Sequence, residues 1–516
     1  MCFDILYGAV QPEAFQSSRL DHVATGLTDR RPHDSRWRRT DVIAIVLLIS
    51  VAAAIRFWNL GHPDTVVFDE LNFGGEAGAY IRGEQFIDSH PPLAVELMAF
   101  GMWLFGDSPA ALRASNAFLG TALVAITYLL ALRMFESRLA AWIAAALVLS
   151  DGEFIVDSRT GMQEMAYVTF AALSYLFLFR FLQSETPAQR RRSLALVGVA
   201  IGLCLAGKLY VPIAVPLLIG GFLVYELMTH GPGRAPIAHP PLARVIVGAF
   251  LLVGSTAAIA WLLVFVPNFI FLRWGGISSI WQYFRDASWL QAGITSGERS
   301  FARDVRAAPW WTWPMVLHPI VYWQESFPDG SIATEWFAPN PIACWSALGA
   351  TIAQAIRLLK RPTFAGAFVA IGYITFLAIF VPISRTTYPY HYMPALYLSY
   401  LALGCEVARC WDGDAAGWER IVILVALAPP ILIAGESTAL MILAGAVLAA
   451  ALVAAIAMRN GGRVASTVSI AAITAAFLYF IPLWMALPIS REAYDARMWL
   501  KGPGIANWTT YERYQQ

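Results

Sequence analysis

Charged residues are scarce in this chain of 516 residues. They make up 14% of it, against about 25% in ordinary globular proteins, while hydrophobic residues reach 58%. A soluble fold of this composition could not cover its surface with polar groups. The 36 Lys and Arg side chains are balanced by 35 Asp and Glu side chains, which excludes a nucleic-acid partner held by bulk positive charge. The sequence therefore predicts an integral membrane protein.

Cysteines and metal or nucleotide motifs are also sparse. The five cysteines lie in or beside apolar segments and form no paired set, so we expect neither a disulfide framework nor a zinc site. No Gly-rich loop stands between a strand and a helix, and the loops expected in the cytoplasm are too short for a nucleotide-binding domain. An ATP-driven pump is therefore disfavoured. No cofactor is predicted, and the need for a divalent cation, Mg²⁺ or Mn²⁺, stays open.

Long apolar runs fill about half of the chain. A helix needs about 20 mainly apolar residues to cross a bilayer, and thirteen runs meet or approach that length. They are residues 41–57, 111–132, 139–150, 165–182, 194–207, 211–228, 245–267, 341–356, 364–383, 392–408, 421–434, 438–457 and 466–486. The sequence thus predicts an all-α polytopic membrane protein with about 11–13 transmembrane helices.

Basic residues predict the orientation of these spans. Lys and Arg concentrate in short cytoplasmic loops, and Arg36, Arg38 and Arg39 directly precede the first span. We therefore expect a cytoplasmic N-terminus, and threading the spans from there makes every short loop on that side basic.

The same threading divides the chain into five parts. They are a basic cytoplasmic segment (1–40), an N-terminal transmembrane catalytic module (41–267) that includes the outer loop 58–110, an outer-face loop (268–340), a C-terminal transmembrane module (341–486) and an outer-face tail (487–516). Residues 93–105 are apolar but too short to span, which predicts an interfacial or re-entrant helix. Apolar residues at helical spacing after residue 277 predict a second amphipathic helix that lies on the membrane.

Two adjacent carboxylates, Asp69 and Glu70, lie in the first outer segment, and Asp88 and His90 follow closely. Burial and a neighbouring negative charge both raise the pKa of a carboxyl group, and such a group can act as a general base toward a hydroxyl. An isolated Asp-Glu pair is more simply interpreted as a solvated acidic turn.

Ionisable residues also lie near the outer ends of several predicted spans. Arg113 opens the second span, Asp157, Arg159 and Glu164 separate the third from the fourth, and Lys208 separates the fifth from the sixth. Such residues are costly beside a membrane and are therefore functional candidates, although long basic side chains also reach for headgroups without further function. Together they would supply cations for a lipid-linked phosphate and a carboxylate for an acceptor proton.

These motifs resemble a known family. The stretch from Phe68 to Leu93 carries Asp-Glu, Phe-Gly and His-Pro-Pro-Leu in the order of the first outer loop of the protein O-mannosyltransferases. Those are inverting, polyprenyl-phosphate-mannose-dependent enzymes of the membrane-embedded GT-C class. Further matches from about residue 41 onward are Leu112-Arg113 to Leu119-Gly120, Asp151-Gly152, Ser158-Arg159, Gly207-Lys208, Pro309 to Pro314 with His318-Pro319, Tyr390 to Pro394, and Leu487 to Ser490.

The resemblance implies roles for individual residues. Asp69 would be the catalytic base for a Ser or Thr hydroxyl, and Glu70 would help to hold the acceptor or the sugar. The donor phosphate would be bound by Arg113, Lys208 and Arg159. The other substrate-binding candidates are His90, Glu164, Trp313, His391 and Tyr392.

The chain departs from the family pattern at two positions. Glu164 stands where the family usually has Asp, and Leu209 stands where a Trp usually follows the lysine. Residues 268–340 are too short to contain the lumenal β-trefoil insert of the eukaryotic enzymes. These features favour a bacterial-type member in the cytoplasmic (inner) membrane, with its active site on the outer face.

The resemblance also implies the partners. They are a polyprenyl-phosphate-mannose lipid, Ser/Thr-containing polypeptides during their translocation, and membrane lipids. Two other functions stay open. A GT-C transferase with a lipid or polysaccharide acceptor would keep the same fold and type of donor. A lipid or solute transporter would need ionisable groups near the bilayer midplane and two related halves, and the sequence shows neither.

Overall fold

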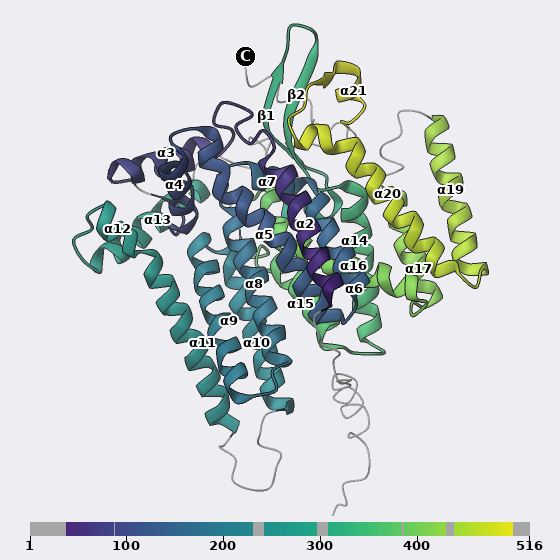
Figure 1. Cartoon of the computed structure of the whole chain (residues 1–516), viewed down its shortest axis with the longest axis horizontal. Helices are drawn as coiled ribbons and strands as arrows, with labels where there is room; N and C mark the ends of the chain where they lie inside the picture. Colours follow the sequence, from purple (N-terminus) through teal and green to yellow (C-terminus); the bar gives the residue numbers. More distant parts are fainter. Residues whose placement is uncertain are drawn as a thin grey trace, which may run out of the picture.

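The computed structural model describes residues 38–86, 88–230, 242–296, 308–383, 386–429 and 438–498. The predicted N-terminal segment up to residue 37, residues 430–434 of one predicted span and the tail beyond residue 498 lie outside the described residues. Most of the described chain is helical (Figure 1).

Helices fill both halves of the chain. Those of the first half are α2 (Arg39–Phe57), α3 (Glu70–Arg82), α4 (Leu93–Phe105), α5 (Pro109–Phe135), α6 (Arg138–Ser150), α7 (Gly152–Arg159), α8 (Glu164–Leu182), α9 (Pro187–Gly207), α10 (Ala214–His230), α11 (Leu242–Val264), α12 (Val266–Phe271) and α13 (Ser278–Ser296). Those of the second half are α14 (Pro341–Leu358), α15 (Phe364–Ala378), α16 (Met393–Asp412), α17 (Gly417–Val425), α19 (Thr438–Ala457), α20 (Gly461–Trp484) and α21 (Arg491–Asp495). Three short 3-10 turns are η1 (Val211–Ile213), η3 (Trp310–Met315) and η4 (Pro389–Tyr392).

Each of the thirteen predicted spans overlaps one of these helices. Within the described ranges, six helices are long and apolar enough to cross a membrane, and the pair α6 and α7, bent by 54°, makes a seventh if it is one span. This number is below the predicted 11–13 because several helices are too short, or carry too many charged residues, to count as membrane spans. For example, α6 has 13 residues, α15 has 15, and α9 carries three arginines near its start. The protein is thus a mostly helical, multi-pass membrane protein.

The helices pack in a continuous bundle with a shared apolar core. Helix α8 packs along α9, and α9 packs along α11, whereas α16 packs against α6, α14, α15 and α20. Helix α16 also contacts α5, so the two predicted transmembrane modules touch along α16. Their division as separate modules stays a prediction.

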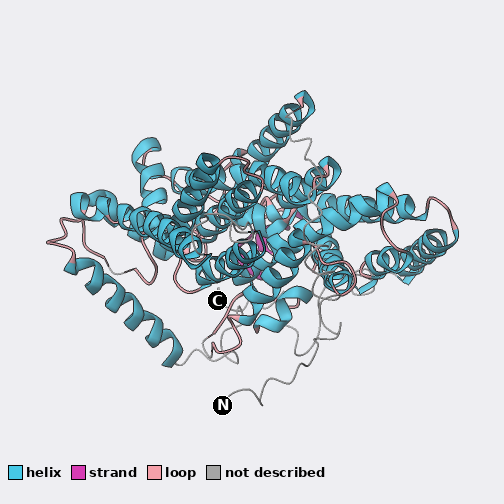
Figure 2. Cartoon of the chain, turned by 90° about the horizontal axis from the view of Figure 1, so that it is seen from below, coloured by secondary structure: helices cyan, strands magenta, loops and turns pink. Residues whose placement is uncertain are grey.

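A small β-sheet interrupts the predicted all-α fold. Strand β1 (Ile320–Ser326) pairs antiparallel with β2 (Ser331–Phe337), with Ile320 opposite Phe337. The short β3 (Ile489–Ser490) joins the other edge of β2. Branched and aromatic residues in the two main strands favour this pairing. Viewed from below, the strands lie near the middle of the helices (Figure 2).

The hairpin of β1 and β2 marks one end of the molecule, which we call the hairpin end. Helices α3 and α4 lie on the same upper side of the view as the hairpin (Figure 1). The predicted short apolar helix at residues 93–105 is α4, and the predicted amphipathic helix after residue 277 is α13. Both predictions of helical structure are therefore confirmed.

A close contact fixes the bend between α6 and α7. The Asp151 carboxylate accepts hydrogen bonds from the backbone N–H of Asn340 at 2.7 Å and from the hydroxyl of Tyr400 at 2.6 Å. The next residue, Gly152, lies so close to α20 that an added Cβ would be 2.1 Å from Nε1 of Trp484. A side chain at this position would therefore push the bend away from the C-terminal helices.

We expect Gly152→Ala to destabilise the protein by about 1–3 kcal/mol, because the added methyl group overpacks a closed contact. The measurement is the midpoint of thermal unfolding in detergent. Gly221→Ala in α10 is the matched control, since nothing lies within 4 Å of its added Cβ. An equal midpoint for both variants would contradict the packing at Gly152.

Candidate active site

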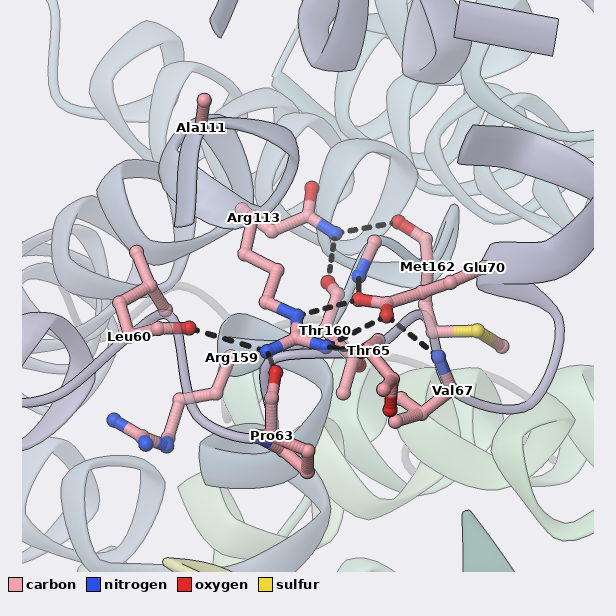
Figure 3. A network of polar contacts seen from close by, with 12 residues as sticks. Leu60, Pro63, Thr65, Val67, Glu70, Ala111, Arg113, Arg159, Thr160 and Met162 are labelled. Atoms are coloured by element: carbon pink, nitrogen blue, oxygen red, sulfur yellow. Dashed lines mark hydrogen bonds and ion pairs between the residues drawn. The ribbon is translucent and has the colours of Figure 1, made fainter. Parts of the chain in front are cut away.

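A buried ion pair between Glu70 and Arg113 organises the hairpin end. Nε and Nη2 of Arg113 donate to the two carboxylate oxygens of Glu70, each at 2.8 Å, and both side chains are fully buried (Figure 3). Glu70 also accepts from the backbone N–H of Val67 at 2.9 Å and of Gly161 at 2.6 Å. Each carboxylate oxygen of Glu70 therefore has two donors, and the pair is bidentate, which is the strongest geometry for these groups.

The other N–H groups of Arg113 hold the loop that follows α2. Nη1 donates to the carbonyl oxygens of Leu60 at 3.2 Å and Pro63 at 2.8 Å, and Nη2 donates to that of Thr65 at 2.8 Å. All five guanidinium donors are then engaged. The prediction that Arg113 binds the donor phosphate does not fit this geometry, because no N–H is left for a phosphate. Glu70 is also buried with both oxygens engaged, so a direct catalytic role for it stays a prediction.

Both residues instead position Asp69. Asp69 is the half-buried N-cap residue of α3, directly before Glu70 in the chain. The preceding residue, Phe68, has a positive φ of 47°, a conformation that side chains rarely adopt unless their surroundings impose it. Its ring stacks on Tyr322 of β1 with a centroid separation of 4.4 Å. The backbone at Asp69 is thus fixed next to the buried ion pair.

A second charged pair lies close by. Nζ of Lys208, the C-cap residue of α9, contacts Oε1 of Glu164, the first residue of α8, and both side chains are buried. Lys208 also lies 4.6 Å above the ring of Tyr390. Glu164 is one methylene longer than the Asp of the family pattern, and it reaches the lysine. An ammonium group has three donors, so Lys208 retains donors for a further anion.

Several buried polar atoms around this pair lack partners. Among the described residues these include Oε2 of Glu164, both carboxylate oxygens of Asp157, the hydroxyls of Tyr167 and Tyr322, and both amide atoms of Gln163. Buried polar groups without hydrogen bonds are rare and costly in native proteins. A cluster of them beside a charged pair is the arrangement expected of a site that receives a polar ligand.

Tyr322 connects the two parts of the site. Burial raises the pKa of its hydroxyl well above the ordinary value, and the nearby negative charges of Asp157, Glu164 and Asp69 add to this rise. The ring of Phe68 also lies 6.4 Å from that of Tyr390, over which Lys208 is placed. Asp69 and the pair of Lys208 and Glu164 are therefore linked through the packed rings of Phe68, Tyr322 and Tyr390.

An apolar cavity of about 410 Å³ begins at Lys208. Its lining comes from α9, α11, α13 and the segment after α15, and includes Leu205, Trp261, Phe284 and Ile383. We call it the lipid cavity. A charged group at one end of an apolar cavity is complementary to a lipid with a phosphate headgroup.

The two predicted histidines lie beside this cavity rather than in one cluster. His90 is largely buried, and its Nδ1 accepts from the backbone N–H of Leu209, next to Lys208, at 3.4 Å. The ring of His391 packs edge-on against Phe380, a cavity residue, with centroids 5.3 Å apart. Both histidines are thus one residue removed from Lys208, His90 through Leu209 and His391 through Tyr390, whose ring lies 4.6 Å from that of His391.

Two other substrate-binding candidates are part of the packed core. Trp313 is almost fully buried, and its Nε1 donates to the carbonyl oxygen of Ala308 at 3.1 Å. Tyr392 is fully buried, and its hydroxyl is 3.0 Å from that of Tyr373. The rings of Trp313 and His391 are stacked with centroids 6.1 Å apart. Substrate binding by Trp313 and Tyr392 stays a prediction.

Arg159 caps the end of α2. Its Nη1 donates to the carbonyl oxygens of Ile55, Arg56 and Trp58 at 3.1, 3.3 and 2.7 Å. A cation at the C-terminal end of a helix satisfies the free carbonyls and the helix dipole. Arg159 is nearly fully buried and its Nε lacks a partner, so phosphate binding by Arg159 stays a prediction.

The structure adds residues that the sequence prediction left out. Burial raises the pKa of Glu335 in β2 to about 8, against the opposing charge of Arg113. Tyr322 joins the polar cluster that contains the predicted candidate Asp157, and Asn116 ties α5 to the loop before α8 through the carbonyl oxygens of Thr160 and Met162 at 2.7 and 2.6 Å. In the part of the chain that the structure describes, no group of three or more His, Cys, Asp or Glu is arranged to hold a metal ion.

We expect Glu70→Gln to cost about 3–5 kcal/mol of stability, because it leaves the buried Arg113 without its counter-charge. The measurement is thermal unfolding followed by tryptophan fluorescence. Glu84→Gln, which breaks an exposed pair with Arg82, should leave the midpoint unchanged. Equal midpoints for the two variants would show that Glu70 does not hold this end of the molecule together.

The sequence matches known families along almost its whole length. Residues 46–112 and 107–284 match the family described as dolichyl-phosphate-mannose-protein mannosyltransferase, and residues 280–502 match the C-terminal four TMM region of protein-O-mannosyltransferase. The chain is 26% identical over 425 residues to the polyprenol-phosphate-mannose–protein mannosyltransferase of Mycolicibacterium smegmatis, an alignment that covers 68% of this chain and 78% of that protein. The protein of the same name from Mycobacterium tuberculosis is 23% identical over 522 residues, covering 88% and 90%.

Solved structures share the fold. The Saccharomyces cerevisiae protein O-mannosyltransferase Pmt1-Pmt2 complex bound to the sugar donor matches with a TM-score of 0.71 at 14% identity, over 95% of this chain and 96% of that chain. ArnT from Cupriavidus metallidurans in the apo state matches with a TM-score of 0.51 at 16% identity, over 86% and 78%. At these identities the likeness concerns the fold alone. Together with the family matches, it shows that the chain belongs to the protein O-mannosyltransferase family, glycosyltransferases that use a polyprenyl- or dolichyl-phosphate-mannose donor.

Proposed function

We propose that Asp69 is the general base of this mannosyltransferase and that Lys208 binds the donor phosphate. The observation that carries the proposal is the convergence of Asp69, the pair of Lys208 and Glu164, and the unpartnered polar atoms on Tyr322, at the head of the lipid cavity. This arrangement has a carboxylate for a proton, a cation for a phosphate and apolar walls for a polyprenyl chain.

The donor has two chemically different ends, and we propose a separate position for each. Its polyprenyl chain would occupy the lipid cavity, where burial of apolar surface supplies binding energy. Its phosphate would lie against Lys208, which retains donors beyond its contact with Glu164. His90, which contacts the backbone of Leu209 next to Lys208, would orient the phosphate or the sugar.

The transfer is proposed to invert the anomeric carbon. The acceptor Ser or Thr hydroxyl loses its proton to Asp69 while its oxygen forms a bond to C1 of mannose. The bond between C1 and the phosphate oxygen breaks on the opposite face, and its electron pair leaves with the polyprenyl phosphate. Lys208 offsets the negative charge that develops on the phosphate.

The site is proposed to face the outer side of a bacterial cytoplasmic membrane, with the N-terminus in the cytoplasm. The basic short loops support this orientation, and the relatives from two mycobacterial species support the type of membrane. An acceptor on that side would be a secreted or membrane polypeptide that is still extended when it reaches the enzyme.

We expect Asp69→Asn to lower mannosyl transfer by about 10²–10⁴-fold, the usual contribution of a general base. The measurement uses purified protein in nanodiscs, radiolabelled polyprenyl-phosphate mannose and a Ser/Thr-rich peptide. Asp64→Asn, at an exposed position of the same loop, is the matched control and should keep activity. Full activity of Asp69→Asn would contradict the assignment of the base. Wild-type label that enters lipid but never peptide would instead favour a lipid acceptor.

Lys208→Met should lower kcat/KM for the donor by about 10- to 100-fold, the effect of losing a hydrogen bond to a charged group. Lys360→Met is the control, because Lys360 is exposed on the loop between α14 and α15. Donor kinetics are measured at saturating peptide. A variant that keeps its donor affinity and rate would show that the phosphate lies elsewhere.

A further inference from the structure

Helix α13 carries two different faces. One side of the helix carries Trp281, which is 76% exposed, and Phe284. Ile277, the residue just before the helix, lies on the same side and is 77% exposed. Ser279, Gln282 and Asp286 follow a spacing of three and four residues on the opposite side. The apolar side is suited to contact with the membrane surface, so the polar side faces away from the membrane.

The polar side lines a second pocket of about 430 Å³, separate from the lipid cavity. Its other walls include Gln85, Phe86 and Trp274, and polar and apolar surface contribute almost equally. Trp274 is half-buried and is held by Phe269, with ring centroids 5.7 Å apart, and by Tyr283. The pocket thus combines a fixed aromatic wall with amide, hydroxyl and carboxylate groups.

This combination matches the chemistry of a hexose. A sugar ring has hydroxyl groups that both donate and accept hydrogen bonds, as Gln, Ser and Asp side chains do, and it has C–H faces that are buried favourably against an aromatic ring. A lipid tail would leave the polar groups unsatisfied. An inorganic anion would meet the carboxylate of Asp286, which pairs at 3.4 Å with Arg285 outside the pocket, and the residues that line the pocket include no cation.

The pocket is also connected to the active site. Tyr283, one of its walls, donates its hydroxyl to the backbone carbonyl oxygen of His90. His90 in turn contacts Leu209, next to Lys208. A ligand in this pocket is therefore separated from the proposed donor phosphate site by only a few packed residues.

We propose that this pocket binds a mannosyl group already attached to the acceptor polypeptide, as a second sugar site distinct from that of the donor. The proposal rests on the proposed function, because it takes the product of the transfer as its ligand. Binding an earlier mannosyl group would hold the polypeptide near Asp69 and favour further transfer to neighbouring Ser or Thr residues.

The test compares two acceptor peptides that differ only in one O-linked mannose. Wild-type enzyme should show a lower KM for the mannosylated peptide, by about three- to tenfold, the size expected for one or two net hydrogen bonds. Trp274→Ala and Gln282→Ala should remove that preference while leaving kcat and the KM of the bare peptide unchanged. Trp281→Ala, on the opposite side of α13, should keep it.

A binding measurement separates this proposal from the catalytic one. Saturation-transfer NMR with the mannosylated peptide should give sugar signals with wild type and Asp69→Asn, weaker signals with Trp274→Ala, and full signals with Trp281→Ala. Equal KM values for both peptides, or sugar signals that Trp274→Ala retains in full, would overturn the second site. Full transfer by Asp69→Asn to both peptides, with the NMR pattern intact, would instead count against the proposed catalytic role alone.

Discussion

The bidentate pair of Glu70 and Arg113 is the constraint on which the rest of the site depends. It joins the loop after α2, the start of α5 and the loop before α8, three segments that are far apart in the sequence. Such a pair is expensive to bury and is stabilising only when every donor and acceptor is used, which is the case here. The consequence is a fixed position for Asp69 at the start of α3.

The buried charges fall into two groups that differ in how completely they are satisfied. Arg113 and the Nη1 group of Arg159 are engaged with carboxylate or carbonyl oxygens of the chain itself, and these residues hold the structure together. Glu164 and Asp157 retain carboxylate oxygens without partners, and they surround Lys208. Arg113 has every donor engaged, whereas Nε of Arg159 lacks a partner, as the oxygens of Asp157 do. Internal satisfaction thus sets Arg113 apart from the charges around Lys208.

Sequence patterns predicted the helices well and individual roles less well. Apolar runs located α2, α5 and α8, and the helical spacing after residue 277 located α13, because burial and amphipathicity are local properties. The hairpin of β1 and β2 is a local structure, joined by the turn residues Pro328, Asp329 and Gly330. It escaped prediction because the aromatic residues around it were assigned to the membrane surface. The resemblance implied that Arg113 and Arg159 bind the phosphate. Their partners in the structure include carbonyl oxygens of another segment. Such partners leave no mark on the sequence around the two arginines, so the sequence could not reveal them.

The most direct test of the account is a structure of the Asp69→Asn variant bound to a polyprenyl-phosphate-mannose donor and an acceptor peptide. The account predicts the acceptor hydroxyl within about 2.6–3.2 Å of the residue 69 side chain, which is the reach of a general base. It also predicts the donor phosphate against Lys208 and the polyprenyl chain in the lipid cavity. A hydroxyl held by another carboxylate, or a phosphate bound at Arg113, would contradict it.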